Sequence, residues 1–241
     1  MKHFIFDVDG TLTPPREKIH DVMSYTLDRI PQENIITLVT GSDLNKLLEQ
    51  IPNFEFADYI FTCSGNVCHE KTANGFKEVY RNIWKPSEEL ISELNEILEL
   101  SCYPFKYGNH LEIRTGTANF SICGRNATAS QRSHYEGWDY IRQERQFFIQ
   151  SLRKKFPDLE FDIGGQISFD IYPKGKNKSQ ILEHIKCLNH FSKSAKHNEF
   201  IFFGDKFDGN DKPLADIVTK IGTVYHVKDW KETLYRLLDY V

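Results

Sequence analysis

Short apolar segments that alternate with helical patterns limit the folds open to this chain more than any other feature. Three lie in the first third of the 241 residues, and two lie in the last third. They are residues 4–6, 35–39, 59–61, 200–203 and 223–225. Strands of a parallel sheet have this near-continuous apolar composition because helices cover both faces of the sheet. The two ends of the chain therefore predict a single Rossmann-like α/β core.

Amphipathic patterns between these segments predict the helices of the core. They cover residues 18–29, 44–51, 178–188 and 230–238, and Ser42-Asp43 is a typical helix start before the second of them. The order of strand and helix matches the repeating unit of a parallel sheet.

The middle of the chain has a different pattern. A helix is predicted at residues 87–100 and a long one at roughly 136–156. Apolar and polar residues alternate in four further segments, which are residues 111–115, 118–122, 159–163 and 167–171. This alternation is typical of an antiparallel sheet with one exposed face, and Gly116 and Gly164-Gly165 supply turns. The sequence thus predicts an α+β cap domain at residues 85–174, inserted into a core formed by residues 1–84 and 175–241.

Two aspartates follow the first apolar segment directly, in Asp7-Val-Asp9-Gly10-Thr-Leu-Thr. Because side chains alternate along an extended strand, Asp7 and Asp9 point the same way. Gly10 allows a sharp turn and a close approach of a ligand. Such a pair suits phosphoryl transfer, in which one carboxylate attacks phosphorus and the other moves a proton. The alternative is an ordinary Asp-Gly turn, which the full string after a buried strand disfavours.

Other predicted strands of the core also end in polar residues. Thr40 and Ser42 could hold phosphate oxygens, Lys178 could neutralise charge, and Asp205 and Asp211 offer oxygen ligands for Mg2+. Taken singly, each has a plain alternative as a helix cap or a solvated surface charge. In an open parallel sheet, however, ligands bind beyond the carboxyl ends of the strands, so we expect these residues to meet at one site.

Three arginines of the inserted segment, Arg114, Arg125 and Arg132, fall on or near its predicted sheet. No matched acid is expected beside them. Guanidinium groups that converge on one face form a good phosphate clamp, because each donates two parallel hydrogen bonds. The alternative for each arginine alone is a solvated surface charge.

Composition excludes several classes of function. The net charge is −4 without a long run of one sign, so nucleic-acid binding and membrane-surface binding have no electrostatic support. No apolar stretch is long enough to cross a bilayer, and no targeting segment is expected before the first strand. The five cysteines are scattered without a CxxC pair, which disfavours zinc and disulfides and suggests a cytoplasmic protein.

The strand-end residues together resemble the haloacid dehalogenase superfamily of aspartate-dependent phosphotransferases. The resemblance implies that Asp7 is the nucleophile and Asp9 the general acid/base. It also implies that Mg2+ is held by Asp7, the carbonyl of Asp9, and Asp205, with Asp211 close by.

A closer resemblance, over nearly the whole chain, is to the eukaryotic-type phosphomannomutases. It rests on residues 6–19, Gly41-Ser-Asp43, Glu112-Ile-Arg114, Gly124-Arg125, Gly164-Gly-Gln-Ile-Ser-Phe-Asp170 and residues 202–206. The family interconverts mannose 6-phosphate and mannose 1-phosphate through an aspartyl-phosphate and a hexose bisphosphate. The resemblance implies substrate contacts from Arg16, from Ser168 and Asp170 to the sugar, and from the three arginines to the remote phosphate. It also implies a homodimer formed through the cap.

Two loops of this chain differ from the family pattern. Thr62-Cys-Ser-Gly-Asn66 stands where the family usually has Pro-Glu-Asn-Gly, and the segment Gly204–Asp211 is shorter than its family counterpart. Two alternatives to a mutase therefore stay open. One is an Mg2+-dependent sugar-phosphate phosphatase with the same residues, and the other is a silent binding protein, which the intact set of Asp7, Asp9, Lys178 and Asp205 disfavours.

Overall fold

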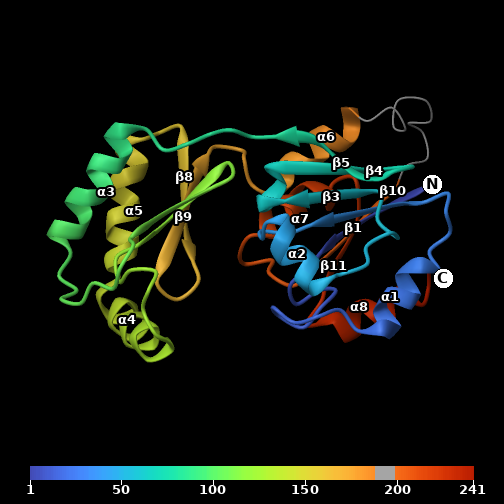
Figure 1. Cartoon of the computed structure of the whole chain (residues 1–241), viewed down its shortest axis with the longest axis horizontal. Coiled ribbons are helices and arrows are strands. Elements are labelled where there is room, and N and C mark those ends of the chain that lie inside the picture. Colours follow the sequence, from blue (N-terminus) through green and yellow to red (C-terminus); the bar gives the residue numbers. More distant parts are fainter. Residues whose placement is uncertain (188–198) are drawn as a thin grey trace. The chain divides into compact units, whose positions relative to one another are not determined.

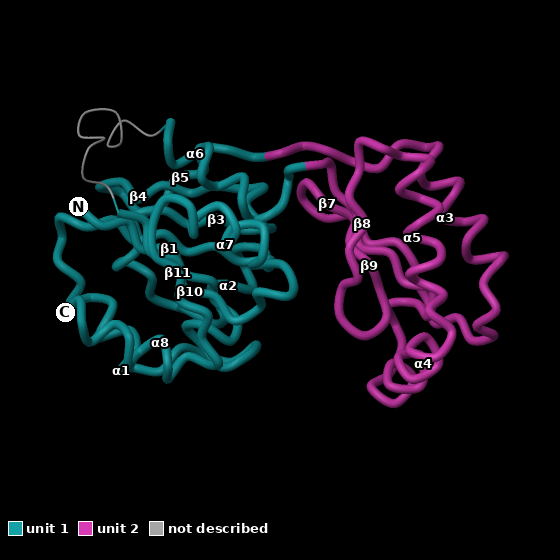
Figure 2. Tube along the Cα trace, turned by 180° about the vertical axis from the view of Figure 1, so that it is seen from behind, with its two compact units in different colours: residues 1–81, 175–241 teal, residues 82–174 magenta. Residues whose placement is uncertain are grey.

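The computed structural model describes residues 1–187 and 199–241, which form two compact units (Figure 2). The core unit joins residues 1–81 to residues 175–241, and the cap unit comprises residues 82–174. The first junction therefore follows residue 81, where the sequence suggested residue 84. Each unit has its own hydrophobic core, so each is described by itself.

The core unit is built on a seven-stranded sheet (Figure 1). In spatial order its strands are β11 (Gly222–His226), β10 (Glu199–Gly204), β1 (Lys2–Asp7), β2 (Ile35–Val39), β3 (Tyr59–Thr62), β4 (Val67–Thr72) and β5 (Gly75–Arg81). The first five run parallel, whereas β4 and β5 form an antiparallel hairpin at one edge. The predicted α/β class is confirmed, since a parallel-sheet core and a separate antiparallel sheet are both present.

Helices cover both faces of the core sheet, which is why its central parallel strands are mostly apolar. Phe4 and Phe6 point to one face, and Ile5 points to the other. The first face packs against α1 (Asp21–Asp28), α2 (Leu44–Gln50) and α8 (Trp230–Leu237). The second packs against α6 (Ile181–Cys187) and α7 (Lys212–Val218).

The order of the strands places the end of β1 at a special position. β1 pairs with β2 on one side and with β10 on the other, so the chain crosses to opposite sides of β1. A crevice forms at such a switch point beyond the carboxyl ends of the strands, and ligands bind there. Asp7 is the last residue of β1.

The sequence did not predict the β4–β5 hairpin or α7. Only the first residues of β4 are buried, and β5 is largely exposed, so neither strand has a continuous apolar run or a regular alternation. Helix α7 contributes three buried residues and has Pro213 in its first turn, a helix-start signal that the short pattern conceals.

Two predicted helices of the core have different starts. The helix expected at residues 18–29 begins only at Asp21. His20 before it is extended, and the backbone N–H of Ile19 donates to Gln50 O at 2.8 Å. The helix expected at 178–188 opens with a 3-10 turn at Lys178–Gln180 and continues as α6. Its predicted last residue, Leu188, lies outside the described residues.

The cap unit consists of a four-stranded antiparallel sheet and three helices. In spatial order the strands are β6 (Leu111–Arg114), β7 (Thr117–Ser121), β9 (Ser168–Pro173) and β8 (Leu159–Gly164). One face of this sheet packs on α3 (Glu88–Leu100) and α5 (Glu144–Lys155), and it carries Phe120 and Phe169. Residues between these, such as Asn119 and Asp170, point to the opposite face of the sheet, which is polar.

The single long helix expected at residues 136–156 is wrong. Two helices occupy this stretch, α4 (Ala129–Arg142) and α5, and Gln143 between them adopts the left-handed region with φ 54°. The Asp139 carboxylate accepts hydrogen bonds from the backbone and side chain of Arg145, which favours a new helix start there. Helix α4 also begins earlier, at a capping box formed by Thr128 and Gln131.

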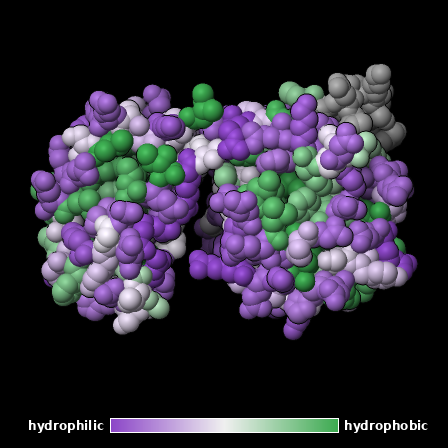
Figure 3. Space-filling model, viewed as in Figure 1, coloured by the Kyte–Doolittle hydropathy of each residue, from purple (hydrophilic) through white to green (hydrophobic). Residues whose placement is uncertain are grey.

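Figure 3 shows hydrophobic groups within the mostly hydrophilic surface of each unit. Among the helices of residues 1–187 and 199–241, none is long and apolar enough to cross a membrane.

Buried His3 of β1 gives the fold an expected sensitivity to acid. Its Nε2 lies 2.7 Å from Thr37 Oγ1, and burial lowers the pKa of His3 to about 3. The unfolded chain, with a histidine pKa of about 6.5, binds more protons between these values, so stability falls as pH falls below 6.5. From pH 7 to pH 5 we expect this group to lower the free energy of unfolding by about 2 kcal/mol.

Urea unfolding at pH 7 and pH 5 measures this contribution. His3→Gln should lose less stability than the wild type over that interval, and the same change at exposed His20 is the control. Equal losses in the wild type and the His3 variant would show that this histidine does not contribute.

Candidate active site

A buried lysine between two aspartates forms the centre of the candidate site. Lys178 Nζ lies 2.5 Å from Asp7 Oδ1 and 2.7 Å from Asp211 Oδ1, and all three side chains are buried. Asp7 ends β1, Lys178 begins the turn before α6, and Asp211 precedes α7. Buried charges persist in proteins only when they are paired and hydrogen-bonded. In this triad each charged side chain has a partner of opposite charge.

The protonation of the triad follows from its burial. Burial raises the pKa of Asp7 to about 7, in opposition to the positive charge of Lys178. Burial alone would lower the pKa of Lys178, but the charges of Asp7 and Asp211 outweigh it and raise that pKa. Lys178 is therefore a cation, since it donates hydrogen bonds to two carboxylates.

Asp205 completes an acidic cluster with Asp7 and Asp211. Carboxylate oxygens of the three residues lie within 4.8 Å of one another. Asp205 Oδ1 is buried and has no hydrogen-bond partner among the described residues. Gly10 (φ 83°) makes room beside it, since a Cβ there would stand 2.4 Å from Asp205 Oδ2. Hard oxygen donors with one unsatisfied atom fit Mg2+.

Asp9 is held away from this cluster by its own partners. Its Oδ1 accepts hydrogen bonds from the backbone N–H of Arg16 and from Gln50 Nε2, both at 2.8 Å. Gln50 is buried at the end of α2, whereas the Arg16 side chain is exposed. The carboxylate of Asp9 is therefore not among the three clustered carboxylates, although its backbone follows β1 directly.

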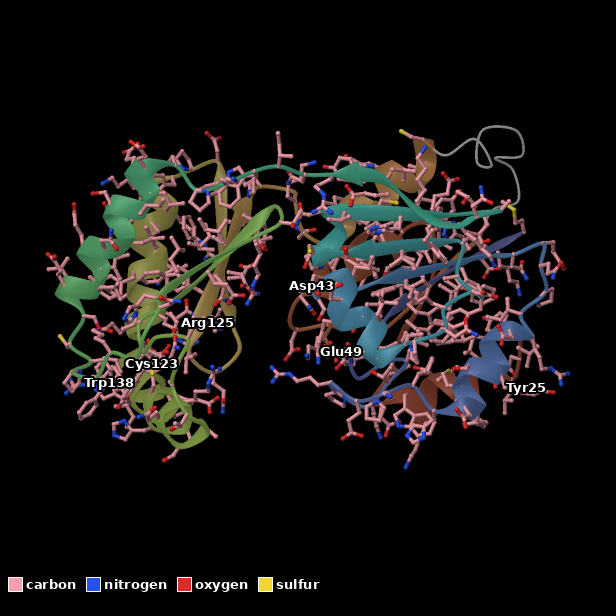
Figure 4. All side chains as sticks on the ribbon, in the orientation of Figure 1. Tyr25, Asp43, Glu49, Cys123, Arg125 and Trp138 are labelled. Atoms are coloured by element: carbon pink, nitrogen blue, oxygen red, sulfur yellow. The ribbon has the colours of Figure 1, made fainter. Side chains whose placement is uncertain are left out.

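The ends of β2 and β3 lie together beside the cluster. Thr40 Oγ1 is buried and accepts from the backbone N–H of Ser42 at 3.1 Å. The backbone N–H of Ser64 donates to Thr40 O. Ser64 Oγ lies close to Gly41, where an added Cβ would stand 3.7 Å from it. Asp43 then caps α2, which Figure 4 shows with Glu49 near its other end. Backbone contacts thus bring the segments that carry Thr40, Ser42 and Ser64 together.

In the cap unit, Ser168 and Asp170 lie on the polar face of the sheet. Asn119, opposite Asp170 in the adjacent strand, donates to Asp170 Oδ1 at 2.7 Å and to Ser168 Oγ at 3.1 Å. Burial raises the pKa of Asp170, in opposition to the hydrogen bond from Asn119. These groups form one hydrogen-bonded cluster on β7 and β9.

The expectation that the cap arginines have no acid beside them is wrong. Glu112 Oε2 lies 2.9 Å from both Arg114 and Arg125, and the hydrogen bonds from Arg114 lower the pKa of Glu112. Register explains the pairing, because Glu112 and Arg114 share one face of β6. Arg125, labelled in Figure 4, comes from the loop after β7.

Arg132 has a different position from the other two cap arginines. It lies on α4, and its guanidinium donates to the backbone carbonyls of Ala127 and Arg125 at 3.0 and 2.9 Å. It therefore stabilises the loop that carries Arg125.

Sequence reasoning missed several residues of these two clusters. Asn119 and Glu112 could have been found, because strand alternation puts both on the face of Asp170 and Arg114. Gln50 and Ser64 had no such signal. They meet Asp9 and Thr40 only through contacts between segments that lie far apart in the sequence.

Comparison with known proteins assigns the family. The family model described as "Eukaryotic phosphomannomutase" matches residues 23–239. A phosphomannomutase of Saccharomyces cerevisiae is 38% identical over 218 residues, which cover 86% of this chain and 82% of that protein. A phosphomannomutase of Drosophila melanogaster is 34% identical over 251 residues and covers 98% and 94% of the two chains.

Solved structures with low identity support the fold. An IMP-nucleotidase of Plasmodium falciparum superposes with a TM-score of 0.65 at 15% identity, and the match covers all of this chain and 68% of that one. A trehalose-6-phosphate phosphatase of Aspergillus fumigatus gives a TM-score of 0.58 at 16% identity and covers 99% and 92% of the two chains.

Proposed function

Because the chain belongs to the eukaryotic phosphomannomutase family, we propose that it interconverts mannose 6-phosphate and mannose 1-phosphate. The observation that carries the proposal is the buried triad of Asp7, Lys178 and Asp211 at the switch point of the core sheet. An aspartate at this position, held by a cation, is suited to accept a phosphoryl group and to return it.

In the proposed reaction, an Asp7 carboxylate oxygen attacks phosphorus of a hexose bisphosphate and forms an aspartyl-phosphate. The bond from phosphorus to the sugar oxygen breaks, and Asp9 donates a proton to that oxygen. In the second half, Asp9 removes a proton from the free hydroxyl of the other hexose monophosphate isomer. That oxygen attacks the aspartyl-phosphate, which restores a hexose bisphosphate and releases Asp7. Gln50 and the backbone N–H of Arg16 orient the Asp9 carboxylate for both transfers.

We assign Mg2+ to the cluster of Asp7, Asp205 and Asp211, with the carbonyl of Asp9 as a further ligand. When bound, the ion would neutralise charge on the transferring phosphoryl group. Lys178 supplies positive charge to Asp7, which favours the ionised form of that carboxylate and limits its repulsion of an anionic substrate. Thr40 and Ser42 are the proposed hydrogen-bond donors to the reacting phosphate.

The polar face of the cap sheet is the proposed site for the remote end of the substrate. Arg114 and Arg125 would bind the remote phosphate, Arg132 would support them, and Ser168 and Asp170 would bind sugar hydroxyls. Glu112 supports this role, because one carboxylate already holds both guanidiniums in a position that suits an anion. The exposed side chain of Arg16 is a further candidate contact to substrate.

The test of the proposed function is 31P NMR of the protein with Mg2+, mannose 1-phosphate and a trace of hexose 1,6-bisphosphate. Mannose 6-phosphate should appear without inorganic phosphate, because a mutase must protect its aspartyl-phosphate from water. No change in the spectrum would contradict both enzymatic functions.

A sugar-phosphate phosphatase is the second candidate, and the loop after β3 favours it. Cys63 and Ser64 both adopt positive φ (52° and 57°) in the segment that departs from the family pattern. In this second candidate, the changed residues of the loop would let water reach the aspartyl-phosphate at Asp7. Accumulation of inorganic phosphate in the same NMR experiment would identify this activity.

Arg125→Ala should separate sugar-phosphate binding from the chemistry at Asp7. We expect KM for the sugar phosphate to rise about 10- to 100-fold, because a charge-assisted hydrogen bond contributes about 1.5–3 kcal/mol. Steady-state turnover of p-nitrophenyl phosphate, which lacks a remote phosphate, should stay near the wild-type value. Arg153→Ala, at an exposed position of α5 in the same unit, is the matched control. Equal losses on both substrates would show that Arg125 has no part in binding the remote phosphate.

The proposed partner is a second copy of the chain, joined through the cap. Three apolar side chains around the α4–α5 junction, Tyr140, Ile141 and Phe147, are 80%, 79% and 68% exposed, which supports this assembly. None of the five cysteines, all of which lie in the described part of the chain, forms a disulfide, which suits the proposed cytoplasmic location.

A further inference from the structure

The ends of β10 and β11 make a contact that the reaction above does not use. The backbone N–H of Val227 donates to Gly204 O at 3.0 Å, and Nε2 of His226 lies 3.0 Å from Asp205 O. A carbonyl only accepts hydrogen bonds, so Nε2 carries the proton. The backbone carbonyls of Gly204 and Asp205 therefore both accept hydrogen bonds from residues at the end of β11.

One peptide group transmits this contact to the acidic cluster. The carbonyl of Asp205 and the N–H of Lys206 belong to the same planar unit. On its other edge, the N–H of Lys206 donates to Asp211 Oδ2 at 3.1 Å. The other oxygen of Asp211 accepts from Lys178 at 2.7 Å. His226 and Asp211 therefore hold this peptide from opposite edges and fix the backbone from which the Asp205 side chain projects.

Stacking sets the direction of the His226 ring. The ring lies on Phe207 with centroids 4.5 Å apart and an interplanar angle of 12°. Phe207 in turn stacks on buried Phe202 of β10, with centroids 5.9 Å apart. Because aromatic stacking restrains the plane of the imidazole, Nε2 is held toward Asp205 O although the histidine is exposed.

We infer that His226 is a positioning residue for the divalent cation, and that it acts by fixing the Asp205–Lys206 peptide. The inference rests on the proposed Mg2+ site. A carboxylate that is already oriented loses less conformational freedom when it binds an ion, so removal of the supporting hydrogen bond should weaken binding. The hydrogen bonds from His226 and Val227 connect the end of β11 to the start of the loop from Gly204 to Asp211.

Two substitutions separate the hydrogen bond from the stacking. His226→Phe keeps an aromatic ring over Phe207 but has no donor, whereas His226→Gln keeps an N–H donor but has no ring. Isothermal titration of the full chain with Mg2+ gives the dissociation constant of each. We expect a rise of about tenfold for His226→Phe and a value within about threefold of the wild type for His226→Gln. His20→Phe, another exposed histidine, is the control.

The outcomes distinguish this inference from the proposed function. A wild-type chain that does not bind Mg2+ would contradict the metal site itself. If the wild type binds Mg2+ and His226→Phe binds it equally well, the hydrogen bond from His226 has no role. Equal weakening in both variants would also overturn that role, and neither outcome would affect the metal site itself. Thermal unfolding in EDTA verifies that each variant is folded, and His226→Leu replaces His226→Phe if the latter is not.

Discussion

Asp7→Asn should remove both mutase and phosphatase activity, with a loss of at least about 10⁴-fold in kcat. An amide nitrogen and oxygen cannot take the place of the attacking carboxylate, and a neutral group also weakens the acidic cluster of Asp205 and Asp211. Asp211 also contacts Lys178, but both of its carboxylate oxygens already accept hydrogen bonds, from Lys178 and from the backbone N–H of Lys206, so we do not expect it to replace Asp7.

The variant should nevertheless fold. Burial disfavours the charge of Asp7 and raises its pKa to about 7, so loss of that charge removes an unfavourable contribution. Lys178 keeps its ion pair with Asp211. We expect a free energy of unfolding within about 1 kcal/mol of the wild type, measured by urea denaturation beside the kinetic assay.

Asp208→Asn is the matched control, because Asp208 is an exposed aspartate in the loop before α7. It should keep turnover near the wild-type value. Turnover by Asp7→Asn at the wild-type rate would refute the nucleophile assignment, and with it the proposed reaction.

Lys178→Met should lower the free energy of unfolding by about 3–5 kcal/mol and abolish activity. The change leaves Asp7 and Asp211 buried without their shared cation, and an unpaired buried charge is strongly destabilising. Loss of turnover has the same origin, because Asp7 would then bind a proton more readily and attack phosphorus less readily.

A double variant tests this origin. Lys178→Met combined with Asp211→Asn removes one of the two uncompensated charges, so it should recover part of the lost stability without recovering activity. Lys206→Met is the control, because that lysine side chain is exposed. A Lys178→Met protein as stable as the wild type would show that the triad is not paired in solution.

The sequence predicts the architecture of the core because burial leaves a direct mark on it. A parallel strand covered on both faces is apolar at most of its positions, so the apolar runs of β1, β2, β3 and β10 can be recognised from composition alone. The site follows from this topology, since polar residues at the ends of parallel strands lie at one edge of the sheet. Asp205, which follows β10, becomes a neighbour of Asp7 in that way, whereas Lys178 reaches Asp7 from the turn before α6.

Elements stabilised by tertiary contacts could not be predicted in this way. The break between α4 and α5 depends on Asp139, whose carboxylate caps the second helix through Arg145. The β4–β5 hairpin has few buried side chains. Gln50 meets Asp9 across forty-one positions of sequence, and no local pattern indicates such a contact.

The pairing of β1 has a consequence for the order of folding. β1 is a central strand, and one of its two neighbours, β10, is synthesised only after the whole cap. The cap is one continuous segment, and its outer strand pairs, β6 with β7 and β8 with β9, join segments near in sequence, so loop closure there requires less entropy. On a ribosome, the first strand must therefore wait with one hydrogen-bonding edge open until the last third of the chain has emerged.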